Sequence, residues 1–256
     1  MADFNNSAWR GAVDTAGTYD AGLRAYMVRI YNYMLIGLLI TATVALGTYS
    51  VTSTTDPALA ATTLRNGVML TRTGAMLYGS PLQWIIIFSP LVLALILQSA
   101  MPRISVSAAR LGFLAFAAIM GVSLSSIFLI YTAASIAQVF FVTAAMFGGM
   151  SLYGYTTKAD LSRFGSFLIM GVWGVVIASV VNVFLQSSML SFVFSVIGVV
   201  VFTGITAYYT QTLKELYDVN DDGTVSGRKA IIGALALYIT FINLFTSLLR
   251  LMGDRR

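Results

Sequence analysis

Long apolar stretches alternate with short polar ones along most of this chain. Each apolar stretch holds about 20 residues, the length at which an α-helix crosses a hydrocarbon layer roughly 30 Å thick. The stretches lie at about residues 30–49, 82–100, 108–130, 136–154, 164–185, 188–208 and 230–252. This pattern predicts an all-α, polytopic membrane protein with seven transmembrane helices.

Some of the polar connections between these helices are very short. Only YTAAS separates the third span from the fourth, and only QSS separates the fifth from the sixth. Each of these pairs is therefore predicted to form a tight antiparallel helical hairpin. Pro90 lies inside the second span, where its missing N–H favours a kink in the helix.

The two ends of the chain are more polar than the spans. Residues 1–25 are rich in small and polar residues without clear periodicity, so they are predicted to form a flexible N-terminal tail. Residues 26–253 are predicted to form a single transmembrane domain, followed by a short C-terminal tail at 254–256. A signal peptide cleaved after residues 45–47 is the alternative interpretation of the first apolar stretch.

Composition narrows the class of protein. Of the 256 residues, 58% are apolar and 10% are charged, whereas about a quarter of a soluble domain is charged. A water-soluble enzyme is therefore excluded. The chain has no cysteine and no histidine, which removes thiolate nucleophiles, the usual nitrogen and sulfur metal ligands and the commonest general base. The sequence predicts neither an enzyme nor a cofactor.

The charged residues indicate topology more than a charged partner. Although the net charge is +5, the basic residues are scattered singly between apolar runs, so no nucleic-acid partner is predicted. Ten Lys and Arg residues fall on the side of the N-terminus and five on the other, which predicts a cytoplasmic N-terminus and a C-terminus across the membrane. All ten acidic residues lie outside the predicted spans, which argues against a carboxylate-driven pump.

A capping pattern occurs in the loop between the fourth and fifth spans. Thr157 is followed three residues later by Asp160, which is the spacing of a capping box at the start of a short interfacial helix. A structural loop that fixes two spans is the simpler interpretation of this pattern, and a functional surface is the alternative.

Small residues recur at a spacing of four in the third span. Ala117, Gly121 and Ser125 form a stripe of the kind that lets two membrane helices approach closely. The stripe predicts helix packing.

The loop DVNDDGTVSGRK at 218–229 begins like a calcium-binding loop. Asp218, Asn220 and Asp222 occupy its first, third and fifth positions, but Lys229 stands where such a loop needs a bidentate glutamate. These three residues are therefore weak candidates for a divalent cation. A solvated acidic loop is the favoured interpretation, and no other metal site is predicted.

Four ordered segments carry a resemblance to a known family. They are GVSLSSIFLIYT (121–132), SLYGYTTKADLSRFG (151–165), FTGITAYYTQ (202–211) and ALALYITFINLFTSLLRLMG (234–253). Together they resemble the Bax inhibitor-1 family of the bacterial kind, from Tyr26 to Gly253. The resemblance implies six helices around a central seventh, a bacterial inner-membrane location, calcium leak with calcium as the permeant ion, and protection from stress or cell death.

The resemblance also points to two positions. The family carries an aspartate where this chain has Tyr209 and another where it has Thr240, and this pair senses pH and gates the calcium path. Two close carboxylates repel, so one titrates toward neutral pH, whereas tyrosine titrates near pH 10 and threonine does not titrate. The family fold is therefore expected to be retained and pH gating to be lost, with a neutral Tyr209 and Thr240 pair able to hold the two helices together. A simple interfacial aromatic belt of Tyr208 and Tyr209 is the alternative.

Two function classes follow from these expectations. The first is a calcium-leak membrane protein without the usual pH sensor. The alternative is a non-conducting interaction protein that modulates another membrane protein, such as a quality-control protease. Membrane lipid is an expected partner in both cases.

Overall fold

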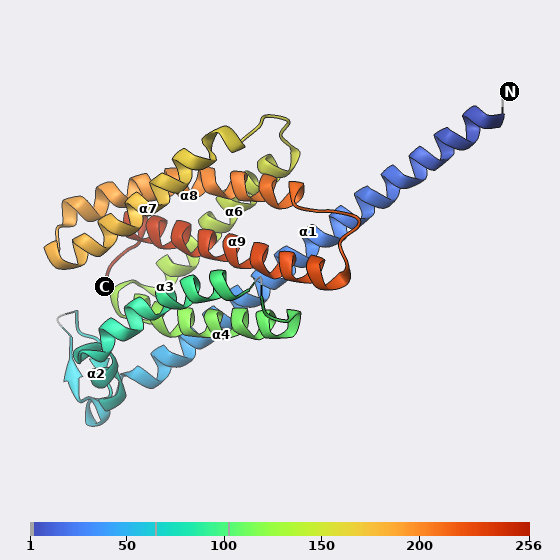
Figure 1. Cartoon of the computed structure of the whole chain (residues 1–256). Coiled ribbons are helices and arrows are strands. Elements are labelled where there is room, and N and C mark those ends of the chain that lie inside the picture. The colour runs from blue at the N-terminus through green and yellow to red at the C-terminus, as the bar shows by residue number, and fades with distance from the viewer. Residues whose placement is uncertain (1–2, 65, 102) are drawn as a thin grey trace.

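A computed structural model describes residues 3–64, 66–101 and 103–256 and is almost entirely helical (Figure 1). The long helices of this described part are α1 (Asp3–Thr52), α3 (Leu82–Ala100), α4 (Val106–Leu124), α6 (Ala133–Thr156), α7 (Ser162–Leu185), α8 (Ser188–Glu215) and α9 (Gly223–Met252). The seven segments long and apolar enough to cross a membrane are Asp20–Thr52, Leu82–Ala100, Val106–Ile130, Ala133–Thr156, Ser162–Asn182, Ser188–Glu215 and Gly223–Met252. The predicted all-α fold with seven spans is confirmed.

Side chains in the short loops set where the helices begin. Ser105 and Thr132 cap α4 and α6 by accepting the backbone N–H of the residue three positions ahead. The QSS connection works in the same way, because Ser187 caps α8 while Gln186 takes a left-handed conformation with φ 50° that ends α7. This turn produces the predicted tight hairpin of α7 and α8.

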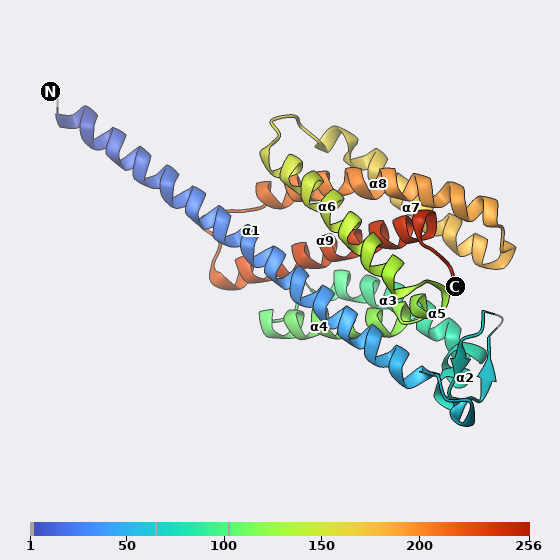
Figure 2. The ribbon, with the colours of Figure 1, turned by 180° about the vertical axis from the view of Figure 1, so that it is seen from behind.

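Helix α9 occupies the centre of the bundle. In its most apolar window 72% of the residues are buried, against 11–33% for the other six candidate spans. Helices α1, α4, α6 and α8 pack directly on α9, while α3 packs mainly on α4 and α7 mainly on α8 (Figures 1 and 2). The expectation of a central seventh helix is confirmed, with four direct neighbours and two outer helices around it.

The predicted N-terminal tail is helical from Asp3 onward. Helix α1 continues through residues 3–25 without a break and projects away from the bundle at its N-terminal end (Figures 1 and 2). Polarity alone suggested a tail, but polar residues do not prevent a helix, and the alanines of this segment favour one. Residues 1 and 2 lie outside the described part of the chain.

The other end of the chain is fastened to the bundle. The backbone N–H of Arg256 donates to the carbonyl of Ile130 at 2.9 Å, and that of Thr132 donates to the carbonyl of Asp254 at 3.1 Å. The side chain of Ser135 accepts the N–H of Asp254 at 2.9 Å. The residues expected as a short C-terminal tail thus form a strap between the end of α9 and the start of α6.

Residues 53–79 form a small folded cap at the end of α1 that the sequence interpretation missed. Strands β1 (Ser53–Thr54), β2 (Thr62–Thr63) and β3 (Met69–Leu70) pair antiparallel in the order β1-β3-β2, and the 3-10 helix η1 (Pro57–Leu59) connects two of them. Helix α2 (Arg72–Gly79) follows, and the one-turn helix α5 (Ile127–Ile130) lies after α4. Two-residue strands show no alternating pattern, so they leave no signal in the sequence.

The predicted capping box between α6 and α7 is wrong. The Thr157 hydroxyl accepts the N–H of Ala159 at 3.2 Å, and the Asp160 carboxylate accepts the N–H of Ser162 at 2.9 Å. Each of these bonds joins residues two positions apart in a local turn, and no short helix forms between Thr157 and Asp160. The Ser162 hydroxyl and backbone N–H lower the pKa of the Asp160 carboxyl.

The small-residue stripe of the third span is a packing surface, as predicted. A Cβ atom at Gly121 would lie 2.7 Å from the Thr41 carbonyl oxygen, so only glycine allows α1 to approach α4 this closely. Ala117 is fully buried on the same face, and Ser125 bonds to the Tyr78 hydroxyl of α2 at 2.6 Å.

Candidate functional site

A hydroxyl network joins α9 to α1 and α4. The Tyr238 hydroxyl lies 2.6 Å from the Thr41 hydroxyl, which lies 2.9 Å from the carbonyls of Gly37 and Ala117. Because Thr41 has a single proton to donate to a carbonyl, Tyr238 is the donor to Thr41. The ring of Tyr238 is fully buried between the edges of two phenylalanines on α4. This network pins three helices in the core.

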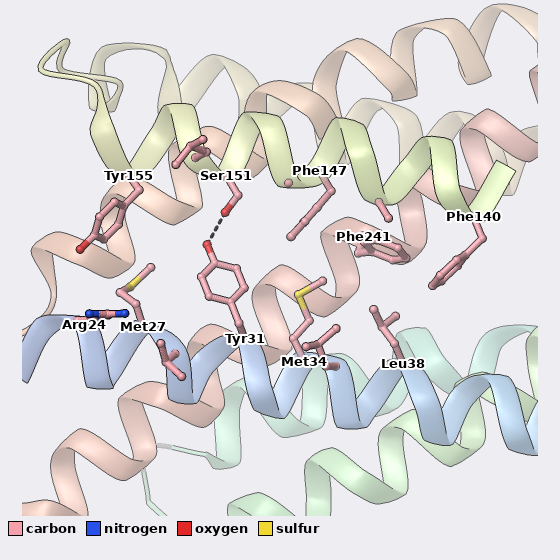
Figure 3. Close-up of a pocket in the computed structure, with 15 residues that line it drawn as sticks. Arg24, Met27, Tyr31, Met34, Leu38, Phe140, Phe147, Ser151, Tyr155 and Phe241 are labelled. Carbon is pink, nitrogen blue, oxygen red and sulfur yellow. Dashed lines mark hydrogen bonds between the residues drawn. The ribbon is translucent and has the colours of Figure 1, made fainter. Parts of the chain in front are cut away.

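A second network runs across α1, α6 and α8. Thr210 donates to the carbonyl of Thr206 at 2.8 Å, and Ser151 lies 3.0 Å from Thr210. The proton of Thr210 is already used, so Ser151 donates to Thr210 and Tyr31 in turn donates to Ser151 (Figure 3). The result is a directed chain of neutral hydroxyl groups through three helices, formed by residues that the sequence interpretation did not select.

The two positions of the expected pH sensor both lie at the α8–α9 interface region but do not bond to each other. Thr240 is 2% exposed and donates to the carbonyl of Ala236 in its own helix at 2.9 Å. Tyr209 is half-buried against the core and lies beside Tyr208, with ring centroids 5.6 Å apart. Among the described residues, no hydrogen bond joins Tyr209 to Thr240.

The offset between the two positions follows from the helix register. A Cβ at Gly233 would meet Leu213, and one at Gly198 would meet Ser247, both at 2.6 Å. In this antiparallel register Thr240 is about level with Thr206, roughly one helical turn from Tyr209. Close packing at small residues therefore holds α8 to α9, and no bond between the two hydroxyls contributes to it.

The polar end of α8 holds the loop between α6 and α7. Gln211 accepts the N–H of Leu161 and donates to the carbonyl of Ala159, each at 2.8 Å. Lys214 donates to the carbonyl of Tyr155 at 2.9 Å. These contacts satisfy backbone groups of a turn whose residues are exposed or partly exposed, and they hold this turn against the end of α8. Thr210 and Gln211 in the segment AYYTQ are therefore structural, and a glutamine at the end of an apolar helix was the available sequence signal.

The three weak cation candidates are used in other ways. The Asp218 carboxylate accepts the N–H of Asn220 at 2.9 Å, and the Asp222 carboxylate caps α9 by accepting two backbone N–H groups. The neighbouring Asp221 forms an ion pair with Lys229 at 2.5 Å. In the part of the chain that the structure describes, no group of three carboxylates could hold a metal ion. The arrangement fits a capping loop better than a calcium site.

A lateral groove of about 640 Å³ lies between α1 and α6. Both helices pack on α9 but little on each other, so a seam stays open between them with Phe241 of α9 at its base (Figure 3). We call this the α1–α6 groove. Its lining residues are Arg24, Met27, Val28, Tyr31, Met34, Leu35, Leu38, Phe140, Ala144, Phe147, Gly148, Ser151, Leu152, Tyr155 and Phe241.

Comparisons with known proteins decide the family. The family described as inhibitor of apoptosis-promoting Bax1 matches residues 23–256, which is nearly the whole chain and includes all of the seven candidate spans except the first three residues of the first one. The chain belongs to the Bax inhibitor-1 family. The resemblance carried by the four sequence segments is confirmed.

Several bacterial proteins are similar to this Bax inhibitor-1 family member over nearly their full length. The inner membrane protein YbhL of Escherichia coli is 44% identical over 238 residues, which cover 92% of this chain and 94% of that protein. An uncharacterized protein of Rickettsia prowazekii is 43% identical over 93% of both chains. An uncharacterized protein of Caulobacter vibrioides is 42% identical over all of both chains.

These relatives and the seven apolar helices support an integral inner-membrane location for this family member. In the described part of the chain, the carboxylates lie outside the candidate spans or at their ends. Asp20 is the first residue of one span and Glu215 the last of another. No titratable carboxylate therefore lies in the middle of the bundle.

Proposed function

We propose that this protein is an inner-membrane calcium-leak protein whose leak does not respond to pH. The observation that carries the proposal is the neutral character of the interior, where hydroxyl groups such as those of Thr240 and Thr206 line the interface of α8 with the central α9. The chain has no histidine, and its described carboxylates lie outside the candidate spans or at their ends. Within the described part of the chain, the interior of the bundle therefore holds no histidine or carboxylate that could respond to a change between pH 5 and pH 8.

Calcium flux into dye-loaded proteoliposomes, measured from pH 5 to pH 8, tests this proposal. The wild-type protein should leak at a rate that changes less than about twofold over this range. The double variant Tyr209→Asp with Thr240→Asp introduces two carboxylates about one turn apart, so one of them should titrate near neutral pH and make the leak pH-dependent.

A matched control separates the effect of where the two carboxylates lie from the effect of the negative charge they add. Tyr208 lies against Gly165 of α7, on the side of α8 away from Thr240. The double variant Tyr208→Asp with Thr240→Asp therefore carries the same added charge without the same pair. Because burial alone raises the pKa of a carboxyl at position 240, its leak should still depend on pH, but less steeply than the leak of the Tyr209→Asp, Thr240→Asp variant. A wild-type leak that switches between pH 5 and pH 8 contradicts the proposal.

A non-conducting interaction protein is the second candidate function. It is supported by the lack of carboxylates in the interior of the described chain, because calcium is bound mainly by charged carboxylate oxygens and the groups found there are neutral hydroxyls such as those of Thr206, Thr210 and Thr240. If neither the wild-type protein nor the Tyr209→Asp, Thr240→Asp variant conducts calcium, this candidate is favoured. Cross-linking in native membranes to a membrane-bound quality-control protease would then identify the modulated partner.

We also propose that the N-terminus is cytoplasmic and the C-terminus lies across the membrane, on the basis of the unequal distribution of Lys and Arg. Because the chain has no cysteine, single cysteines report the side directly. A membrane-impermeant maleimide added to intact spheroplasts should label Ala60→Cys in the cap and spare Ala159→Cys in the α6–α7 loop. Labelling of Ala159→Cys alone would reverse the orientation.

A further inference from the structure

The α1–α6 groove has the length of one membrane leaflet. On α1 it runs from Arg24 to Leu38, a rise of about 21 Å, and on α6 from Tyr155 to Phe140, a rise of about 22 Å. A bilayer with its headgroup regions is about 40–45 Å thick, so half of it is about 20–22 Å. Arg24 lies four residues after the start of the candidate span Asp20–Thr52, so a groove of this length is expected to run from near one membrane surface to about the bilayer midplane.

The two ends of the groove differ in chemistry. Arg24 and the hydroxyl end of Tyr155 lie together at the mouth on facing helices, while Met34, Leu38 and Phe140 line the deep end (Figure 3). Arg24 is exposed and makes no ion pair within the described part of the chain. Lys214 adds a second cation beside Tyr155, 5.3 Å from its ring centroid. The groove thus joins a cationic, hydrogen-bonding mouth to an apolar channel.

The Tyr31–Ser151 hydrogen bond divides these two ends. It links α1 to α6 midway along the groove (Figure 3), while the helices otherwise pack little on each other. An occupant must therefore be long, narrow and apolar beyond this point. An acyl chain meets these requirements, whereas a peptide helix about 10 Å wide does not fit a seam of this volume.

We propose that the α1–α6 groove binds one anionic phospholipid from the leaflet on the N-terminal side. The lipid phosphate accepts hydrogen bonds from the Arg24 guanidinium and the Tyr155 hydroxyl, and one acyl chain lies along Met34, Phe147 and Phe241 toward the midplane. A guanidinium pairs with a lipid phosphate through charge-assisted, often bidentate hydrogen bonds. A zwitterionic lipid carries the same phosphate but also a cationic group that Arg24 and Lys214 repel, which favours an anionic headgroup. The bound lipid fills the seam that helix packing leaves open.

Neighbouring glycines on α6 provide a matched pair of variants. A Cβ at Gly148 or at Gly149 meets no atom within 4 Å, so both positions accept a side chain without a clash. Only Gly148 lines the groove. Gly148→Leu should therefore fill the lipid site, while Gly149→Leu makes the same change to the same helix one residue away.

Native mass spectrometry of the delipidated full-length protein, titrated with phosphatidylglycerol or with phosphatidylcholine of the same acyl chains, tests the proposal. The wild-type protein and Gly149→Leu should bind one phosphatidylglycerol with saturation and in preference to phosphatidylcholine. Gly148→Leu should lose this binding. Arg24→Gln should weaken it roughly tenfold and remove the headgroup preference, while Arg24→Lys should restore part of it.

Three outcomes would overturn the proposal. The first is equal binding by Gly148→Leu and Gly149→Leu. The second is equal affinity of the wild-type protein for the two lipids, which would make the groove a non-selective apolar surface. The third is unchanged phosphatidylglycerol binding by Arg24→Gln. If Gly148→Leu shows a lower unfolding temperature than Gly149→Leu, Ala144→Leu replaces it, because Ala144 also lines the groove and is exposed.

Discussion

The core around α9 and the seam between α1 and α6 are built from the same kinds of residue but packed in opposite ways. In the core, glycines sit where backbones nearly touch: a Cβ at Gly154 of α6 would lie 2.2 Å from the Ala207 carbonyl oxygen of α8. In the seam, Gly148 of the same helix faces open space. Helix α6 therefore has a close-packed side and an open side. A glycine on the first side allows a close approach of α8, whereas a glycine on the second side faces the open groove.

The hydroxyl groups of the two regions differ in the same sense. Tyr238 is fully buried, and its bond to Thr41 closes a network inside the protein. Tyr31 lies on the wall of the groove, and its bond to Ser151 is the visible link across an otherwise open seam (Figure 3). In lipid, apolar burial alone drives little helix association, so close contact and hydrogen bonds carry it. The core has both close helix contacts and interhelical hydrogen bonds, whereas the seam between α1 and α6 is held mainly by the Tyr31–Ser151 hydrogen bond.

A contrast in the sign of the stability change is expected between glycine substitutions on α6. Gly154→Ala places a methyl group against the backbone of α8 and should destabilise the protein by roughly 1–3 kcal/mol or more. Gly149→Ala meets no atom and should be neutral or stabilising by up to about 1 kcal/mol, because alanine favours a helix. Unfolding by titrated denaturing detergent measures both. Equal stability of the two variants would mean that α6 and α8 are not packed closely at Gly154.

A contrast in the size of the stability loss is expected between two phenylalanines. Phe116 is fully buried beside Tyr238, so Phe116→Ala should leave a cavity and cost about 3–5 kcal/mol. Phe140 lines the groove and is 39% exposed, so Phe140→Ala should cost less than half as much. The same detergent titration applies. A larger loss for Phe140→Ala would place the main packing of the bundle in the seam.

The smallest effects should come from single hydroxyl groups. Tyr238→Phe and Tyr31→Phe should each cost about 0.6 kcal/mol, up to about 1.7 kcal/mol, as is typical of hydrogen bonds between membrane helices. The two variants should differ in which helices become less protected from hydrogen exchange. Hydrogen exchange followed by mass spectrometry should show faster exchange in α1 and α6 for Tyr31→Phe, and in α1 and α4 for Tyr238→Phe. Identical exchange patterns would contradict the division into two regions.

Much of this fold could be predicted from local patterns. Apolar runs of about 20 residues and the stripe at Ala117 and Gly121 each concern a single helix, and the structure confirms both. The groove and the hydroxyl chain from Tyr31 to Thr206 depend on which helices become neighbours, and a sequence pattern does not contain that information. The resemblance indicated Tyr209 and Thr240, yet it could not show that Thr240 bonds to its own helix.

The fastening of α9 at both ends constrains how the bundle can move. Near its start Lys229 donates to the carbonyl of Leu216 at the end of α8 at 3.0 Å, and the strap formed by Asp254 and Arg256 ties its last turn to the start of α6. A helix that is held at both ends resists displacement along its own axis. A conformational change that opens the bundle must therefore displace the helices around α9 while α9 itself stays in place.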